Sequence, residues 1–427
     1  MEKKKIKIGL LPRIIIAIIL GIVFGLFMPR AIVRLFVTFN SIFSNFLQFL
    51  IPLIIVGLVT PAISDIGKGA GKLLLITVLI AYCDTVFSGL LSYGTSVTVF
   101  PKLIGGTTAE SVAEFENLEP YFTIQIPPMV DVMAALVFAF TLGLGMAFFG
   151  SPSLKRFADE FKDIIVKTIE VVIIPLLPVY IFGIFLGMTH TGQALQVIKV
   201  FISIIGVIFI LHVFLLVFQY CIAGGIVGKN PFKLLGKMLP AYFTALGTSS
   251  SAATIPVTLE CTKKNGVSQE IAGFTVPLCA TIHLSGSCLK ITACAVALMM
   301  MQGMPFDFWM FLGFIMMLGV MMVAAPGVPG GAIMAALGVL AAMLGFGEQE
   351  QALMIALYIT MDNFGTACNV TGDGAIALVM DKLFHRGHQG HQSHRGVRLD
   401  HQGQIPQDVH QDQIPQDVRL DPEDGCS

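Results

Sequence analysis

An all-helical protein that crosses a membrane several times is the fold class that this sequence predicts. Hydrophobic residues make up 55% of its 427 residues and charged residues only 12%, with a mean hydropathy of +0.82, which is far from the composition of soluble globular proteins. Apolar stretches long enough to cross a bilayer follow one another through the first half. In the second half, glycine, proline and serine interrupt such stretches, which favours helices that break inside the membrane.

Six conventional membrane-spanning helices are expected before residue 228. Their apolar segments lie near residues 12–29, 40–62, 73–100, 127–150, 164–189 and 196–225. The first segment follows a basic stretch, as in a signal peptide, but no small-residue cleavage site comes after it. We therefore expect this segment to be a retained first helix.

Two later segments, 236–260 and 311–346, combine apolar residues with a break in the middle. The first break reads TSSSAATIP and the second APGVPGG. Unpaired backbone groups survive at membrane depth only beside protein, ions or water, so that a pair of broken segments indicates the binding site of a transporter. Basic residues flank both ends of the first segment, which predicts a re-entrant hairpin that returns to the side it came from. The second segment is its expected counterpart from the other side.

Charges in the loops predict the orientation of the chain. Basic residues gather near the N-terminus and in segments 65–72, 153–163, 229–237 and 263–264, whereas the 101–126 loop carries four glutamates against one lysine. The positive-inside rule therefore places the N-terminus and the basic segments in the cytoplasm and the acidic loop outside. The predicted location is the plasma membrane, with several passes through the lipid.

A polar stripe lies inside the last apolar segment, which runs from about residue 352 to 380. Asp362 and Thr366 are four residues apart, and Asn369 and Asp373 follow after three and four more, so that all four share one face of a helix. Ionisable groups at membrane depth are costly unless they face a cavity, an ion or a partner, which marks them as functional by default. We expect this face to line a binding site.

Several other classes of protein are disfavoured. The chain has no HExxH or GxSxG motif, which argues against an intramembrane enzyme, and a net charge of −1 without a basic patch argues against nucleic-acid binding. The eight cysteines form no CxxC pair and are expected to be small buried hydrophobes. Residues 384–427 are polar and repetitive and hold six of the nine histidines, so that they are predicted to be a disordered tail outside the fold.

Three motifs give the chain a specific resemblance to a known family. They are TSSSAATIPVT at 248–258, PGVPGGAIM at 326–334 and NVTGD at 369–373, while HLSGS at 283–287 stands where the family has Asn-Met-Asp-Gly-Thr. With these motifs in the family's order, the chain up to about Leu383 resembles the dicarboxylate/amino acid:cation symporters, the glutamate-transporter-like secondary transporters.

The resemblance implies a homotrimer in which each subunit has eight transmembrane helices and two re-entrant hairpins. Residues 1–228 are then mainly scaffold, with the third and sixth helices contributing to the transport domain. Residues 229–383 form the transport core, which carries solute and cations across the membrane by an elevator motion. The expected function is secondary active, sodium-coupled import of a small amino acid or dicarboxylate.

The resemblance also implies roles for individual residues. The positions of Asp362 and Thr366 hold the ammonium group of the substrate. The position of Asn369 binds the substrate's α-carboxylate and a sodium ion, and that of Asp373 is a sodium ligand. Further substrate contacts are expected from the hairpin tips and the last two helices, at Ser250, Ser251, Ser287, Gly327, Val328, Pro329, Gly330 and Gly365.

Two departures from the family bear on the substrate. Gly365 and Ser249 stand where members that carry acidic substrates have an arginine. A second substrate carboxylate needs a fixed cation in a desolvated pocket, so that a neutral amino acid such as serine, threonine or alanine is favoured. The alternatives are an acidic amino acid or C4-dicarboxylate held by Lys290 or His283, a sodium-independent or proton-coupled exchanger and, outside this class, an ion channel.

The family's deeper sodium site is also altered. Tyr82 and Thr85 match residues that line this site, which would make them sodium ligands. However, His283 and Ser285 replace the asparagine and aspartate of the seventh-helix motif. This replacement weakens the case for a sodium ion at the deeper site.

A basic residue is a candidate to replace that ion. Lys290 follows His283 by seven residues, about two helical turns, and therefore is expected on the same face. We predict an ion pair between Lys290 and Asp84, tuned by His283, that substitutes a fixed or titratable positive charge for the sodium. Fewer Na⁺ ions would then be coupled, with H⁺ as a further candidate, and Lys290 is expected to lie away from Asp362.

Overall fold

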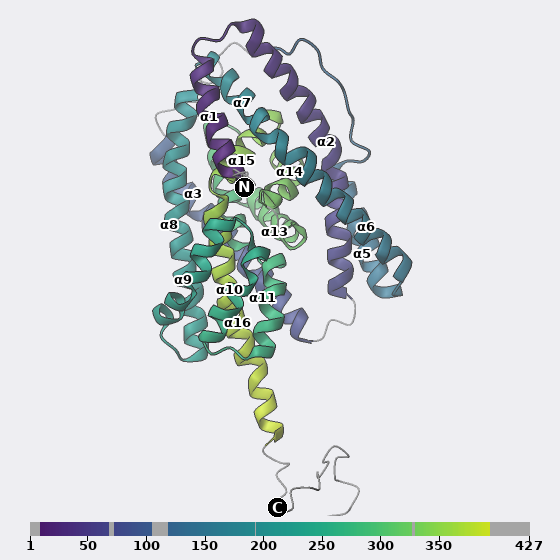
Figure 1. Cartoon of the computed structure of the whole chain (residues 1–427), viewed down its shortest axis with the longest axis vertical. Helices are drawn as coiled ribbons and strands as arrows, with labels where there is room; N and C mark the ends of the chain where they lie inside the picture. Colours follow the sequence, from purple (N-terminus) through teal and green to yellow (C-terminus); the bar gives the residue numbers. More distant parts are fainter. Residues whose placement is uncertain (1–8, 68–71, 105–117, 193, 327–328, 393–427) are drawn as a thin grey trace, which may run out of the picture. The chain divides into compact units, whose positions relative to one another are not determined.

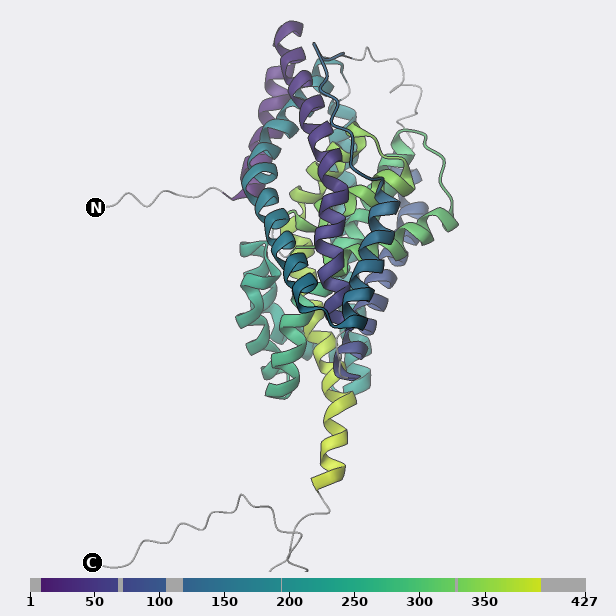
Figure 2. The same cartoon turned by 90° about the vertical axis from the view of Figure 1, so that its right-hand side faces the viewer.

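The computed structural model describes residues 9–67, 72–104, 118–192, 194–326 and 329–392. Every regular element among them is helical, as the sequence predicts. The chain divides into two units at Lys382 and Leu383. The arrangement described below, and seen in Figures 1 and 2, is that of the first unit.

The first half of the chain folds into helices that contain most of each predicted apolar segment. In chain order they are α1 (Leu10–Gly25), α2 (Arg30–Gly67), α3 (Lys72–Ile104), α5 (Val132–Phe149), α6 (Pro152–Thr168), α7 (Ile174–His190) and α8 (Ala194–Val227). A π-helical turn, Ile169–Ile173, joins α6 to α7. Helix α1 packs along α7, and α2 packs along α5 (Figure 1).

Residues 153–163, predicted to be a loop, are instead part of helix α6. Pro152 stands in the first turn of this helix, where its missing N–H is not needed. Arg156 and Glu160 form an ion pair of 2.8 Å across one turn. The charges that suggested a loop therefore belong to the polar face of an amphipathic helix.

Two helical hairpins form where the sequence predicts them. Hairpin 1 consists of α9 (Pro231–Thr248) and α10 (Ser251–Lys264), and hairpin 2 of α13 (Phe308–Ala324) and α14 (Gly331–Leu344). The chain turns at Ser249 and at Gly330, whose φ values of 52° and 76° lie in the left-handed region. Hairpin 1 lies in the lower part of the first unit, and hairpin 2 lies above it (Figures 1 and 2).

Two interrupted helices complete the core. Extended backbone at His283 separates α11 (Gln269–Ile282) from α12 (Ser285–Met301), and Met361 separates α15 (Glu348–Thr360) from α16 (Asp362–Gln392). Helix α12 is buried along almost its whole length and packs along α3. Both interruptions therefore place backbone and polar side chains deep inside the protein.

Six of the described helical stretches are long and apolar enough to cross a membrane. They are Arg30–Asp65, Lys72–Leu103, Val132–Phe149, Pro152–His190, Val197–Val227 and Gln269–Met301. Helix α1, expected as the first conventional span, is shorter, as are α13 and α14. These lengths fit a membrane protein of several passes, and the total of eight spans stays a prediction.

Most of the cysteines are buried, as the sequence predicts. Five of those in the described residues lie in the interior, namely Cys261, Cys279, Cys288, Cys294 and Cys368. Cys83 and Cys221 are exposed, so that the prediction is wrong for these two.

Parts of three predictions lie outside the described residues. They are most of the acidic loop (105–117), Gly327 and Val328 at the tip of hairpin 2, and residues 393–427 of the polar tail. Helix α16 continues to Gln392, so that the tail predicted to begin at residue 384 is helical in its first residues.

Candidate functional site

Both hairpin tips and the break between α11 and α12 border one small cavity beside α16. Its volume is about 30 Å³. Five predicted site residues line it, namely Ser251, Ser287, Asp362, Thr366 and Asn369. The other lining residues are Ser249, Ala280, Thr281, Leu284, Ala325, Pro326, Ala332 and Tyr358. The fold therefore gathers most of the described candidate substrate residues around one point.

The serine-rich tip of hairpin 1 presents the N-terminus of α10 to this cavity. Ser250 caps the helix, because its Oγ accepts a hydrogen bond of 3.3 Å from the Ala253 N–H. Ser251, in the first turn, is buried against the cavity. The free N–H groups at a helix start carry partial positive charge, so that this side of the cavity favours an anionic group.

The first two residues of α16 hold the tips of both hairpins. Asp362 Oδ2 accepts a hydrogen bond of 2.9 Å from the Gly330 N–H of hairpin 2. Asn363 Nδ2 donates to the Leu246 carbonyl of hairpin 1 at 2.7 Å, and its Oδ1 accepts from the Ser249 hydroxyl. Adjacent side chains thus fix the two hairpins to the same helix end.

The tip of hairpin 2 differs from the prediction in one respect. Gly330 meets the site through its N–H group, on Asp362. Pro329, predicted to contact the substrate, lines a neighbouring cavity of about 340 Å³ together with Thr248 and Asn363. Among the described residues, Pro326 is the proline of this tip that lines the small cavity.

Asn369 and Ser287 meet between α16 and α12. Asn369 Nδ2 donates a hydrogen bond of 3.2 Å to Ser287 Oγ, and the Ser287 hydroxyl lies 3.0 Å from the Tyr358 hydroxyl. The Thr366 hydroxyl donates to the Asp362 carbonyl of its own helix at 2.9 Å. The cavity is therefore bordered by amide and hydroxyl groups that can donate to a carboxylate.

Lys290 pairs with Asp362, and the predicted ion pair with Asp84 is wrong. Lys290 Nζ lies 3.1 Å from Asp362 Oδ1 and 3.5 Å from the centre of the Tyr358 ring, and the side chain is 0% exposed. Gly365 leaves the space that the lysine fills, because a Cβ there would lie 2.6 Å from Nζ. The expectation that Lys290 lies away from Asp362 is therefore also wrong.

The break between α11 and α12 explains this error. His283 has φ −108° and ψ 100°, outside the helical region, so that helical spacing does not carry from His283 to Lys290. As a result the two basic side chains reach different carboxylates of α16. Lys290 contacts Asp362 at its start, whereas His283 contacts Asp373 three turns later.

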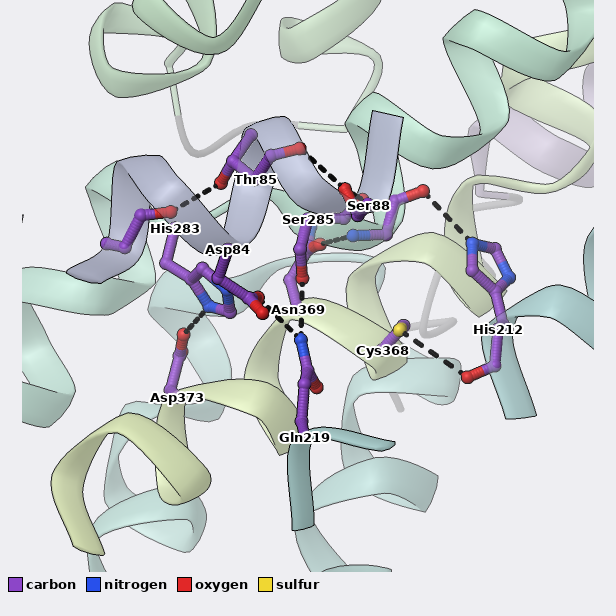
Figure 3. A network of polar contacts seen from close by, with 12 residues as sticks. Asp84, Thr85, Ser88, His212, Gln219, His283, Ser285, Cys368, Asn369 and Asp373 are labelled. Atoms are coloured by element: carbon purple, nitrogen blue, oxygen red, sulfur yellow. Dashed lines mark hydrogen bonds and ion pairs between the residues drawn. The ribbon is translucent and has the colours of Figure 1, made fainter. Parts of the chain in front are cut away.

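His283 lies between two carboxylates in a buried polar network (Figure 3). Its Nδ1 is 2.9 Å from Asp373 Oδ1, and its Nε2 is 2.8 Å from Asp84 Oδ2. Gln219 of α8 donates to the same Asp84 oxygen at 2.6 Å and to Ser285 Oγ at 3.2 Å. Each ring nitrogen needs a hydrogen for its contact and a neutral imidazole has only one, so that the histidine and the two carboxyl groups share two protons.

Comparisons with known proteins bear on this arrangement. The sequence model of the sodium:dicarboxylate symporter family matches residues 10–383. The chain belongs to this family. A serine/threonine transporter, SstT, of Acinetobacter baylyi is 25% identical over 88% of this chain and 98% of its own length. A proton/sodium-glutamate symport protein of Bacillus subtilis is 25% identical over 89% of this chain and 94% of its own length. The neutral amino acid transporter B(0) of Rattus norvegicus is 32% identical over 34% of this chain and 26% of its own length.

Sodium coupling is implied by this family, and the residues around Asp373 fit a sodium ion. Asp373 Oδ2 is buried without a hydrogen-bond partner in the described part of the chain. Oxygen atoms of carboxylate, amide and hydroxyl groups are the ligands that hard cations prefer. The unpaired carboxylate oxygen is the observation that favours a cation here.

The residues that match the family's deeper sodium site do not fit an ion as well. The Tyr82 hydroxyl donates to the Met316 carbonyl at 3.0 Å, and the Thr85 hydroxyl donates to the Ala81 carbonyl at 2.8 Å. Between them in sequence, Asp84 contacts the His283 ring and accepts a hydrogen bond from the Gln219 amide, both through Oδ2. One oxygen of the carboxylate that an ion at this depth would need, Asp84 Oδ2, is therefore already in contact with two side chains.

Sequence reasoning missed two residues of the site, Gln219 and Tyr358. Gln219 is a polar residue in the apolar segment 196–225, which is a signal that could have identified it. Tyr358 stands in an apolar run with no such signal, and only the fold places its ring over Lys290.

Proposed function

We propose that the chain is a sodium-coupled symporter that carries a small carboxylate-bearing solute, an amino acid or a related organic acid, in the cavity between its hairpin tips. The convergence of the α10 N-terminus, Ser287 and Asn369 on one cavity carries this proposal. Such donors suit a carboxylate, and Asp373 supplies an unpaired oxygen for sodium further along the same helix. The names of the two long relatives above, a serine/threonine transporter and a glutamate symport protein, support solutes of this size and charge.

The nature of the solute depends on Lys290. The sequence favours a neutral amino acid, because neither Gly365 nor Ser249 supplies a cation. Lys290 fills the space beside Gly365 and places its ammonium group on Asp362. A cation is therefore present near the position of the missing arginine, although it comes from α12. This contact favours the alternative of a more anionic solute.

The proposal includes the family's elevator arrangement. The cavity is lined entirely by residues between 249 and 369, within the expected transport core, while α3 and α8 contribute Asp84 and Gln219 beneath it. This distribution supports a transport unit formed by residues 229–383 with the third and sixth predicted spans. The homotrimer rests on the resemblance and is testable by mass measurement of the purified protein in detergent.

Uptake into proteoliposomes tests the proposal. We expect uptake of at least one small amino or organic acid to require a sodium gradient and to fall strongly in Asn369→Ala, which removes the amide from the cavity. Thr141→Ala is a matched control, because this exposed hydroxyl of α5 contacts only the Val137 carbonyl among the described residues. Steady currents without solute would instead favour an ion channel, and sodium-independent transport would favour an exchanger.

A further inference from the structure

We infer that Lys290 occupies, as a built-in ammonium group, the place at Asp362 where the amino group of a substrate would bind. The solute of this protein is then a small carboxylate that lacks an ammonium group. This inference rests on the proposed function, since it names the class of solute carried in the same cavity.

Both oxygens of the Asp362 carboxylate already have partners. Oδ1 contacts Lys290 Nζ at 3.1 Å, and Oδ2 accepts from the Gly330 N–H at 2.9 Å. An ammonium group of a solute would have to displace one of these donors or share an oxygen with it. Displacing the second donor would also release the tip of hairpin 2.

The Lys290 side chain is enclosed by neighbouring residues, which opposes its displacement from Asp362. The side chain is 0% exposed, its Nζ lies over the Tyr358 ring, and it also donates to the Met361 carbonyl at 3.4 Å. Its end fills the space above Gly365. A lysine that left Asp362 would be an unpaired buried charge, which is strongly unfavourable.

The charge balance of the cavity also opposes a second ammonium group. Asp362 and Lys290 together are neutral, so that no net negative charge remains to attract a cation. Two ammonium groups on one carboxylate would repel each other at short range. Other polar groups of the cavity, among them the α10 N-terminus, Ser287 and Asn369, can donate hydrogen bonds and so favour an anion.

Pairs of solutes that differ in one amino group test the inference. Malate and aspartate form one such pair, and glycerate and serine another, with hydroxyl in place of ammonium. We expect the purified wild-type protein in sodium to be stabilised against heat by malate or glycerate at concentrations about tenfold or more below those needed for the amino acid partner. The same order is expected for uptake into proteoliposomes.

Variants of Lys290 show whether this residue causes the preference. Lys290→Met frees Asp362, so that we expect the ratio within each pair to move by about tenfold or more toward the amino acid. Lys290→Arg keeps the cation and should keep the preference. Because the Met variant leaves an unpaired carboxylate and could fail to fold, Lys290→Met with Asp362→Asn provides a second measurement. This neutral pair should still bind the amine-free acid and gain no affinity for the amino acid.

The outcomes separate this inference from the proposed function. Preference of the wild type for aspartate or serine overturns the inference and leaves the symport of a carboxylate-bearing solute intact. An unchanged ratio in Lys290→Met, or a gain of amino acid binding in the double variant, also overturns it. Absence of any sodium-dependent binding or uptake across both solute pairs overturns the proposed function and the inference together.

Discussion

The two buried carboxylates of α16, Asp362 and Asp373, lie on one helix face and each contacts a basic side chain, yet they are satisfied differently. Asp362 uses both oxygens, on the Lys290 ammonium and the Gly330 N–H. Asp373 uses one oxygen on the His283 ring, and its other oxygen has no partner among the described residues. A polar stripe that looks uniform in the sequence therefore has one closed end and one open end.

The chemistry of the two basic partners explains the difference. The Lys290 ammonium group and the Gly330 N–H occupy both oxygens of Asp362, so that neither oxygen is left for a further cation. An imidazole can give up a proton and become neutral, so that a carboxylate beside it can accept another positive charge. The Asp373 end is the place where a mobile cation can still bind, and the Asp362 end already holds its cation.

The largest expected effect comes from breaking the closed end. Asp362→Asn leaves Lys290 as a buried charge without its carboxylate, and we expect a loss of roughly 3–5 kcal/mol of stability. Asp373→Asn should lose much less, because His283 keeps its contact with the Asp84 carboxylate. Thermal unfolding in detergent measures both, and equal losses in the two variants would contradict the contrast.

The second effect concerns the open end. We expect Asp373→Asn to abolish stabilisation by sodium, which for the wild type is about 2.7 kcal/mol at a concentration 100-fold above the dissociation constant. Asp84→Asn is the control, since it removes the other carboxylate that contacts His283 and leaves Asp373 in place. Melting temperatures in sodium and in choline chloride provide the measurement. Loss of the sodium effect in the control alone would place the ion at the deeper site.

A smaller effect tests how tightly Lys290 is enclosed. Gly365→Ala places a Cβ 2.6 Å from Nζ, and we expect a loss of about 1–3 kcal/mol from overpacking. Gly145→Ala on α5 is the matched control, because its Cβ meets no atom within 4 Å. The control should be neutral or gain up to about 1 kcal/mol from helix propensity. Similar stability of the two variants would show that the lysine can move aside.

The smallest effect is a change in the sodium dependence of uptake. Restoring the family's residues with His283→Asn and Ser285→Asp removes the ring from between the carboxylates and adds an oxygen ligand. We expect the Hill slope for sodium to rise by up to about one, because a second ion then has a site. His283→Asn alone should leave the slope unchanged. A wild type that already shows the steeper slope would argue that the deeper site binds sodium.

Much of the fold could be predicted because it depends on features that are local in the sequence. Apolar length predicts the long helices, and the serine and glycine/proline breaks predict the hairpins. The four-, three- and four-residue intervals from Asp362 to Asp373 predict a face of one helix, which α16 confirms because it is continuous there.

The partners of the basic residues could not be predicted in the same way. Residue spacing predicts a shared face only within an unbroken helix. Because the backbone is extended at His283, the seven-residue interval does not place His283 and Lys290 on one helix face. The space above Gly365 that admits the lysine is visible only when α12 and α16 are packed together. Gln219 reaches Asp84 from α8, so that this contact likewise depends on how distant helices meet.

The adjacent side chains at the start of α16 hold the two hairpins through different chemical groups. Asp362 holds hairpin 2 by its carboxylate, and Asn363 holds hairpin 1 by its amide. A group that draws the Asp362 carboxylate away loosens hairpin 2 and leaves the amide contact of hairpin 1 in place. Hairpin 2 is therefore bound by a charged group that responds to a cation, whereas hairpin 1 is bound by a neutral group that does not.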